Sequence, residues 1–156
     1  MKRILTSGSR RARATLFAAA LAAVPAAAVA GDPLVPYRVS GGEIPEPLGG
    51  LKGDPVRGRE LYLSRESNCA LCHLLPDGDP RQMGDIGPPL GGVASRFSIG
   101  ALRLRVVDSR RINPGTIMPA YYRVDGLNRV AAAYAGRPVL TAQEIEDVVA
   151  FLATLR

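Results

Sequence analysis

The sequence predicts a small all-α domain over residues 54–156, and three observations support this fold class. Thr141-Ala142-Gln143-Glu144 is a capping box, which begins a helix, and a single apolar stripe follows it. Asp54-Pro55 is a second helix start. No stretch alternates apolar and polar residues as a half-buried strand does, and no internal repeat is present.

The first thirty residues have the features of a secretory signal peptide. An Ala-rich run from residue 16 to residue 30 ends in Ala28-Val29-Ala30, which has the small-x-small pattern of a cleavage site. A membrane anchor is the alternative, but the run is short and is broken by Pro25. We therefore expect residues 1–30 to be cleaved on export to the periplasm, leaving no membrane span. The run is preceded by the cations Lys2, Arg3, Arg10, Arg11 and Arg13.

The basic character of the chain belongs to this leader. The whole sequence carries 20 Lys and Arg against 14 Asp and Glu, a net charge of +6. Five of the cations lie in the leader, which leaves 15 against 14 in the mature part. The mature part has no basic stripe interleaved with aromatic residues, so nucleic acid is not an expected partner.

Residues 31–53 are expected to form an extended, semi-flexible arm. Ten of these 23 residues are Gly or Pro, and neither a helical nor a strand period runs through them. Two roles remain open for the arm: a tether left after cleavage, or a segment that wraps around a partner subunit.

The first helix is expected to begin at Asp54, with Pro55 in the first helical position, where its missing N–H is not needed. Val56, Leu61 and Tyr62 give this helix a modest apolar face. Residues 74–92 contain nine Gly and Pro and are predicted to be a loop.

A second helix is expected to start with Ser98 as its cap and to bury one apolar face. Asn113-Pro114-Gly115 ends any continuation of it. The last helix follows the capping box at Thr141, which satisfies first-turn N–H groups. The expected buried residues of these two helices are Ile99, Leu102, Val106, Ile145, Val148, Val149 and Leu152.

Cys69-Ala70-Leu71-Cys72-His73 is a C-x-x-C-H pentapeptide, the pattern of covalent haem attachment. The spacing lets both cysteines form thioethers with the two vinyl edges of the haem from one side of the ring. The adjacent His73 is then carried to the iron as an axial ligand. The motif predicts one covalently attached haem c.

Three other interpretations of the pentapeptide are weaker. A structural zinc site needs four ligands, whereas the two cysteines and one histidine of the whole sequence all lie in this motif. A thioredoxin-like dithiol needs a βαβ setting, which the sequence does not predict. A structural disulfide is possible in an oxidising compartment but leaves His73 unexplained.

The other axial ligand has two candidates, Met83 and Met118, and chain length excludes neither. Met118 lies between turn-forming Asn113-Pro114-Gly115 and the rigid Pro119, in a loop suited to hold a thioether at fixed geometry. Met83 follows His73 by ten residues, in a loop expected to stay on the histidine side. We favour Met118. A His/Met pair fills both axial positions and raises the reduction potential, which suits electron transfer better than catalysis at iron.

Gly87-Pro88-Pro89-Leu90-Gly91 would be an ordinary turn in isolation. After a haem motif it predicts support for the pocket, with Gly87, Pro88 and Leu90 as its residues. A carbonyl here would accept the Nδ1–H of His73 and fix the orientation of the ring.

Two pairs of cations, Arg103 with Arg105 and Arg110 with Arg111, are expected near the haem rim. They belong either to a solvated helix face or to a site that pairs with haem propionates or a docking partner. The sequence does not choose between these roles.

Taken together, these motifs resemble a class I c-type cytochrome and, more narrowly, the SoxX family, the monohaem subunit of the SoxXA complex of bacterial thiosulfate oxidation. The resemblance covers about residues 54–156, and its most specific stretch runs from Asn113 through Met118-Pro119 to Tyr122. One departure is Ser67, where a glycine is expected before Asn68.

The resemblance implies a class I cytochrome c-like domain around one haem, paired in a heterodimer with a SoxA-type haem subunit. Such a complex, an L-cysteine S-thiosulfotransferase, oxidatively joins thiosulfate to a cysteine of the carrier SoxYZ, with its active centre on the partner. The present chain would then relay electrons to a small downstream cytochrome. A free-standing soluble electron-shuttle cytochrome c is the main alternative, and an enzyme or sensor with an open iron site is another.

Overall fold

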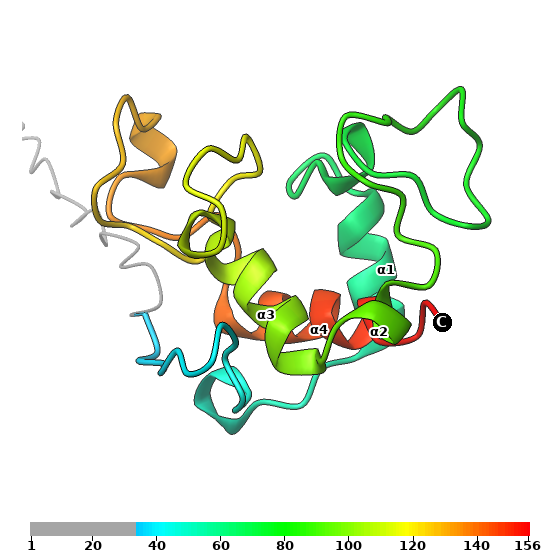
Figure 1. The fold of residues 1–156 in the computed structure, drawn as a ribbon. Helices are drawn as coiled ribbons and strands as arrows, with labels where there is room; N and C mark the ends of the chain where they lie inside the picture. Colours follow the sequence, from blue (N-terminus) through cyan, green and yellow to red (C-terminus); the bar gives the residue numbers. More distant parts are fainter. Residues whose placement is uncertain (1–33) are drawn as a thin grey trace, which may run out of the picture.

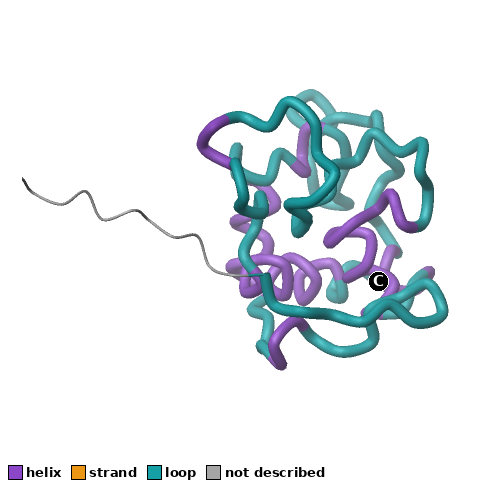
Figure 2. The backbone as a smooth tube through the Cα atoms, turned by 90° about the vertical axis from the view of Figure 1, so that its left-hand side faces the viewer, coloured by secondary structure: helices purple, strands orange, loops and turns teal. Residues whose placement is uncertain are grey.

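The computed structural model describes residues 34–156, so the expected signal peptide lies outside the described residues. The described part is helical and contains no β-strand, only one isolated bridge between Ser40 and Glu43 (Figures 1 and 2). None of its helices is long and apolar enough to cross a membrane. The all-α class is confirmed. Its helices are α1 (Pro55–Leu63), α2 (Val93–Arg96), α3 (Ile99–Asp108) and α4 (Ala142–Leu152), with single 3-10 turns η1 (Leu48–Gly50), η2 (Cys69–Leu71), η3 (Ser109–Arg111) and η4 (Ala132–Tyr134).

The three longer helices begin where the sequence predicts. Asp54 accepts hydrogen bonds from the first-turn N–H groups of α1, at 2.8 Å from the nitrogen of Val56. Ser98 caps α3 through the N–H of Ala101, at 3.0 Å. Thr141 and Glu144 form the predicted capping box of α4. Local cap chemistry therefore sets the start of each helix.

Helices α1 and α4 cross in direct contact, and α3 packs against α4 from the other side (Figure 1). Gly58 lies at the α1–α4 crossing, where an added Cβ would collide with the carbonyl oxygen of Asp147 and lie 2.9 Å from the Cβ of Phe151. Beside it, the rings of Tyr62 and Phe151 pack with their centroids 5.7 Å apart. The close approach of the two backbones thus depends on a residue without a side chain.

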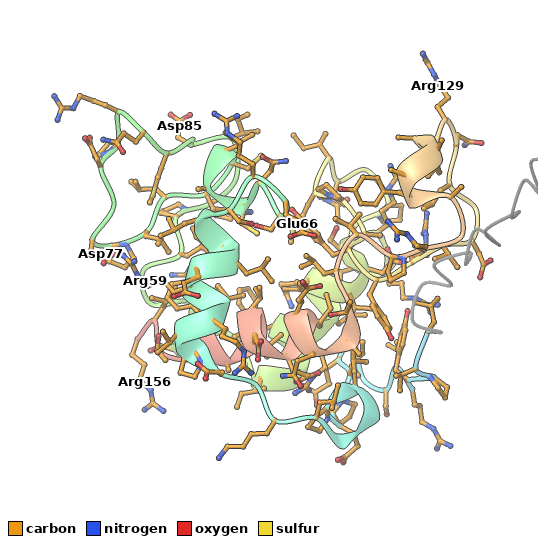
Figure 3. The ribbon with its side chains drawn as sticks, turned by 180° about the vertical axis from the view of Figure 1, so that it is seen from behind. Arg59, Glu66, Asp77, Asp85, Arg129 and Arg156 are labelled. Atoms are coloured by element: carbon orange, nitrogen blue, oxygen red, sulfur yellow. The ribbon has the colours of Figure 1, made fainter. Side chains whose placement is uncertain are left out.

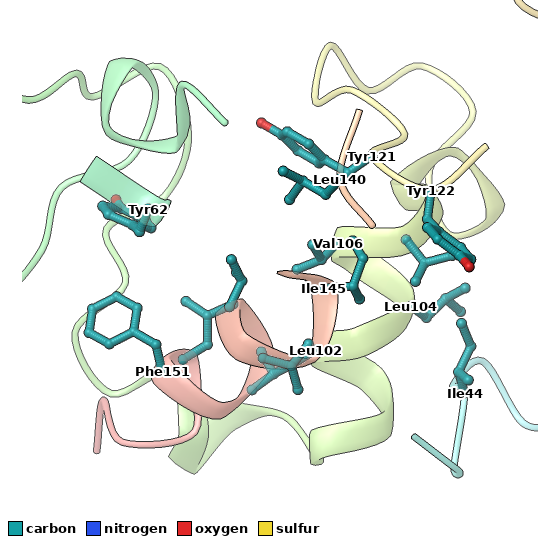
Figure 4. Close-up of a cluster of buried hydrophobic side chains, with 14 of the residues drawn as sticks. Ile44, Tyr62, Leu102, Leu104, Val106, Tyr121, Tyr122, Leu140, Ile145 and Phe151 are labelled. Atoms are coloured by element: carbon teal, nitrogen blue, oxygen red, sulfur yellow. The ribbon is translucent and has the colours of Figure 1, made fainter. Parts of the chain in front are cut away.

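The apolar stripe of α4 forms the centre of the core, as predicted, together with the inner face of α3 (Figure 4). Two expectations about the helix faces were wrong. Val56 is 67% exposed and Ile99 is 55% exposed. Both residues stand in the first turn of their helices, at the edge of the core, and the buried faces begin later.

The expected semi-flexible arm is corrected by the structure. Its described part, residues 34–53, has little regular structure, yet Ile44 is 1% exposed and Leu48 is 0% exposed. The backbone N–H of Ile44 also donates to the carbonyl of Gly100 in α3, at 3.0 Å. This segment is part of the packed domain. Two single apolar residues among glycines and prolines carry no periodic signal, so the sequence did not reveal their burial.

A buried ion pair fastens the segment to the helices. The guanidinium of Arg103 in α3 donates to both carboxylate oxygens of Glu146 in α4, at 2.8 and 3.0 Å. It also donates to the carbonyl of Ile44 at 2.7 Å, while Glu146 accepts the N–H of Leu48 at 2.9 Å. The expectation that Arg103 lies on a solvated face or at the haem rim was wrong. Its side chain is buried, where it pairs with Glu146 and binds the backbone of residues 44–48.

The long loop over residues 74–92 is confirmed and is anchored at the surface. Arg59 of α1 pairs with Asp77 of the loop at 2.9 Å, and Figure 3 shows the two side chains side by side on the outside of the domain. Both side chains are largely solvated, so this pair contributes little to stability.

Candidate haem-binding site

A cavity of about 600 Å³ opens between the segment that follows α1 and the loop that follows α3. Val148 and Leu152 of α4 and Leu102 and Val106 of α3 contribute to its lining, which is predominantly apolar. All the predicted site residues line it, and Met83 does not. The residues brought together are Cys69, Cys72, His73, Gly87, Pro88, Leu90 and Met118.

The pentapeptide forms one tight turn, which aims its reactive side chains at the same space. Asn68 precedes it in the left-handed region (φ 54°), a conformation that asparagine tolerates better than most residues. The N–H groups of Cys72 and His73 then both donate to the carbonyl of Cys69, at 3.1 and 3.0 Å. Burial raises the pKa of the Cys69 thiol. The turn presents two unpaired thiols and an imidazole to the cavity.

The orientation of the imidazole is fixed from the loop at residues 86–90. Its Nδ1 lies 2.7 Å from the carbonyl oxygen of Pro88. Because a carbonyl can only accept, this contact places the proton on Nδ1 and leaves Nε2 as the atom able to bind a metal. The N–H of Gly87 donates to the backbone carbonyl of Cys72 at 2.7 Å. The hydroxyl of Tyr62 donates to the backbone carbonyl of His73, also at 2.7 Å. The histidine is thus held through its ring and its backbone.

Gly87 is the residue that lets this loop approach the imidazole. An added Cβ would lie 2.6 Å from Nδ1 of His73 and closer still to Cε1. Gly87→Ala is therefore expected to displace the ring and to cost about 2 kcal/mol of stability, in the range of overpacking substitutions. Guanidinium unfolding together with the visible spectrum of the haem-loaded protein would measure both effects.

Gly91→Ala is the matched control for this prediction. The atom nearest to its added Cβ is Cγ of Pro76, at an ordinary contact distance of 3.4 Å. Equal stability and equal spectra for the two variants would contradict the role assigned to Gly87.

The loop at residues 112–119 faces the pentapeptide across the cavity, and it is the loop drawn in yellow in Figure 1. Two hydrogen bonds fix the backbone of Met118: its N–H donates to the Thr116 hydroxyl at 3.1 Å, and its carbonyl accepts from the Ser109 hydroxyl at 3.0 Å. The side chain of Met83 instead lies against Gly78 of its own loop. Its sulfur is so close to Gly78 that a Cβ added there would collide with it.

Of the four cations expected near the rim, Arg105 alone lines the cavity. Its guanidinium stacks over the ring of Phe97 at 3.8 Å, and burial lowers its pKa. Arg110 and Arg111 are exposed, and Arg111 lies 3.7 Å from Asp108. Sequence reasoning missed Arg96, which also lines the cavity and is held by carbonyls of the 86–91 loop, at 2.6 Å for Gly91.

The residues of this cavity fit a covalently attached haem. Two thiols stand one turn apart, an imidazole presents its free nitrogen, and a thioether lies across an apolar space of the size that large organic ligands occupy. Within residues 34–156 no cluster of three or more His, Cys, Asp or Glu side chains is arranged for a metal ion. The fold and the site together define a c-type cytochrome.

Comparison with known proteins gives the same class. Residues 55–156 match the family described as cytochrome c, so the chain belongs to the cytochrome c family, whose members carry covalently bound haem c and transfer electrons. The chain is similar to a chain in the crystal structure of SoxXA from P. pantotrophus, at 36% sequence identity and a TM-score of 0.68. The alignment covers 76% of this chain and 93% of that chain, which supports the resemblance to SoxX. No curated protein sequence matched.

Proposed function

We propose that this chain is the electron-transfer subunit of a SoxXA-type complex and holds a single haem through Cys69, Cys72, His73 and Met118. The observation that carries the proposal is the convergence of these four side chains on one apolar cavity. The similarity to a chain of SoxXA supports the assignment to this type of complex.

Each residue group has a separate task in this site. The thiols of Cys69 and Cys72 would attach the haem covalently, and the Pro88 carbonyl orients His73 so that Nε2 is free to bind the iron. Met118 would supply the second donor to the iron, and the apolar lining would limit the access of bulk water. The bound haem supplies one-electron redox chemistry. If His73 and Met118 both bind the iron, the site would favour electron transfer over binding of a substrate at iron.

The partner that we propose is a SoxA-type haem subunit, in a periplasmic complex that joins thiosulfate to the carrier cysteine of SoxYZ. Formation of a sulfur–sulfur bond from a thiol and thiosulfate releases two electrons, whereas one haem iron accepts them singly. The present chain would therefore pass electrons on to a small downstream cytochrome. Both cysteines of the sequence are used for haem attachment, so the chain is not itself the sulfur carrier.

Gel filtration and mass spectrometry of material purified from the periplasm test this proposal. We expect a polypeptide that begins at Gly31, carries the added mass of one haem, and co-elutes with a second haem protein. The double variant Cys69→Ala/Cys72→Ala is the control that should lack the added mass. A stable haem-bearing monomer that elutes alone would indicate a free-standing electron shuttle, and a wild-type chain without added mass would contradict the site assignment itself.

A further inference from the structure

The two walls of the cavity come from distant parts of the chain. One wall is the pentapeptide with the loop that supports it, and the other is the loop that carries Met118. Simultaneous coordination of one iron by His73 and Met118 requires a fixed distance between these walls. The structure must therefore contain contacts that set this distance.

One side chain, that of Tyr121, makes the hydrogen bond that connects the walls directly. The hydroxyl of Tyr121 donates to the carbonyl oxygen of Ser67 at 2.6 Å, in a buried environment. Between residues 61–92 and residues 105–125, all of which the structure describes, the other hydrogen-bonding contact also comes from Tyr121, to the thiol of Cys69, which haem attachment would convert to a thioether. Ser67 stands two residues before Cys69, and Tyr121 stands three residues after Met118. The hydrogen bond thus joins a residue next to the pentapeptide to a residue next to Met118.

Tyr121 is a firm anchor for such a bond. Its backbone N–H donates to the carbonyl of Val106 in α3 at 3.3 Å, and its carbonyl accepts the N–H of Leu140 at 3.0 Å. The side chain is 5% exposed and lines the cavity. In Figure 4 its ring projects from the side of α3 toward the side that carries Tyr62. Burial raises the pKa of the phenol, so the hydroxyl stays protonated and remains a donor.

Ser67 is an equally firm acceptor. It is 2% exposed, and its own hydroxyl donates to the carbonyl of Leu61 at the end of α1, at 2.6 Å. The other group near its carbonyl is the thiol of Cys69, at 4.0 Å, which loses its proton on thioether formation. Without Tyr121 this buried carbonyl would have no strong donor.

We propose that Tyr121 is a positioning residue for the axial methionine: its hydroxyl, bound to the Ser67 carbonyl, holds the Met118 loop at the correct distance from the haem-attachment segment. The inference rests on the proposed coordination by His73 and Met118. It assigns to Tyr121 a role in the iron–sulfur bond that differs from the contribution of an ordinary buried tyrosine to stability.

The adjacent Tyr122 is a matched control. It is also buried (2% exposed), and its hydroxyl also makes one hydrogen bond to the backbone, accepting the N–H of Val35 at 2.8 Å. It does not line the cavity. Tyr121→Phe and Tyr122→Phe therefore each remove one hydroxyl, but only the first breaks the connection between the walls.

The experiment measures how readily imidazole displaces the methionine from ferric, haem-loaded protein, followed by loss of the methionine-to-iron absorption band. The loss of one buried hydrogen bond should raise the population of the form in which Met118 has left the iron by about five- to tenfold. We therefore expect Tyr121→Phe to bind imidazole more tightly than wild type by about this factor. Tyr122→Phe should stay within twofold of wild type, although helical circular dichroism should show both variants somewhat destabilised.

Equal imidazole affinity in the two variants would overturn the inference, because Tyr121 would then act on general stability alone. Should Tyr121→Phe not fold, 3-fluorotyrosine at position 121 keeps the hydroxyl and should bind imidazole no more tightly than wild type; tighter binding would contradict the proposal. The proposed coordination is tested separately: if wild type lacks the band, or Met118→Ala retains it, the ligand assignment fails and the inference fails with it.

Discussion

Met118→Ala is expected to abolish the methionine-to-ferric-iron absorption band completely and to lower the reduction potential, whereas Met83→Ala should change neither. Met118 lines the cavity on the side opposite His73, and its backbone is hydrogen-bonded to the hydroxyls of Ser109 and Thr116. Met83 lies outside that lining. A thioether ligand stabilises ferrous over ferric iron, so its loss favours the ferric form. Visible spectroscopy and redox titration of the haem-loaded variants would measure both effects.

Met83→Ala controls for the general loss of a partly buried methionine, since Met83 also packs against the core. It is expected to lower stability, as removal of a buried methionine does, without opening a coordination position. Loss of the band in Met83→Ala, with its retention in Met118→Ala, would reassign the ligand. Retention in both variants would indicate a donor other than methionine.

Gly58→Ala is expected to destabilise the domain by at least about 2 kcal/mol, although alanine is the better helix former by about 1 kcal/mol. The added Cβ would collide with the carbonyl of Asp147 in α4, and a backbone group cannot rotate away as a side chain can. Relief would require α1 and α4 to move apart, which would disturb the packing of Tyr62 on Phe151. The steric cost therefore exceeds the gain in helix propensity.

Thermal unfolding of the haem-loaded protein, followed by circular dichroism, would show this effect as a decrease in Tm of about 8 °C for a domain of this size. Gly91→Ala, which has room for its Cβ, should change Tm by no more than a few degrees. A Gly58→Ala variant as stable as wild type would show that the two helices can separate at little cost.

Much of the helical framework could be predicted because its signals are local. The cap residues Asp54, Ser98 and Thr141 act on N–H groups within the next three residues, and the 3.6-residue period of α4 is visible in eleven residues of sequence. The residues expected to hold the haem were predicted from local signals too, because the pentapeptide and the Gly87-Pro88 stretch are short motifs with defined chemistry.

The contacts that could not be predicted join residues far apart in sequence. Arg103 and Glu146 are 43 positions apart, Leu48 and Glu146 are 98 apart, and Tyr121 and Ser67 are 54 apart. Nothing in the immediate surroundings of these residues marks one as the partner of the other. An arginine on a helix is most often solvated, so the burial of Arg103 became evident only from the fold.

Arg103 and Glu146 bind residues 44–48, so the part of the chain expected to fold on its own begins before residue 54. A fragment trimmed to residue 54 would keep all the predicted helices, but the guanidinium would lose the Ile44 carbonyl and the carboxylate would lose the Leu48 amide. Two charges that are buried in the intact domain would then lose these partners and become exposed to solvent. The apolar surface that Ile44 and Leu48 cover would be exposed with them. Residues 34–53 are accordingly a structural component of the domain and not a free linker.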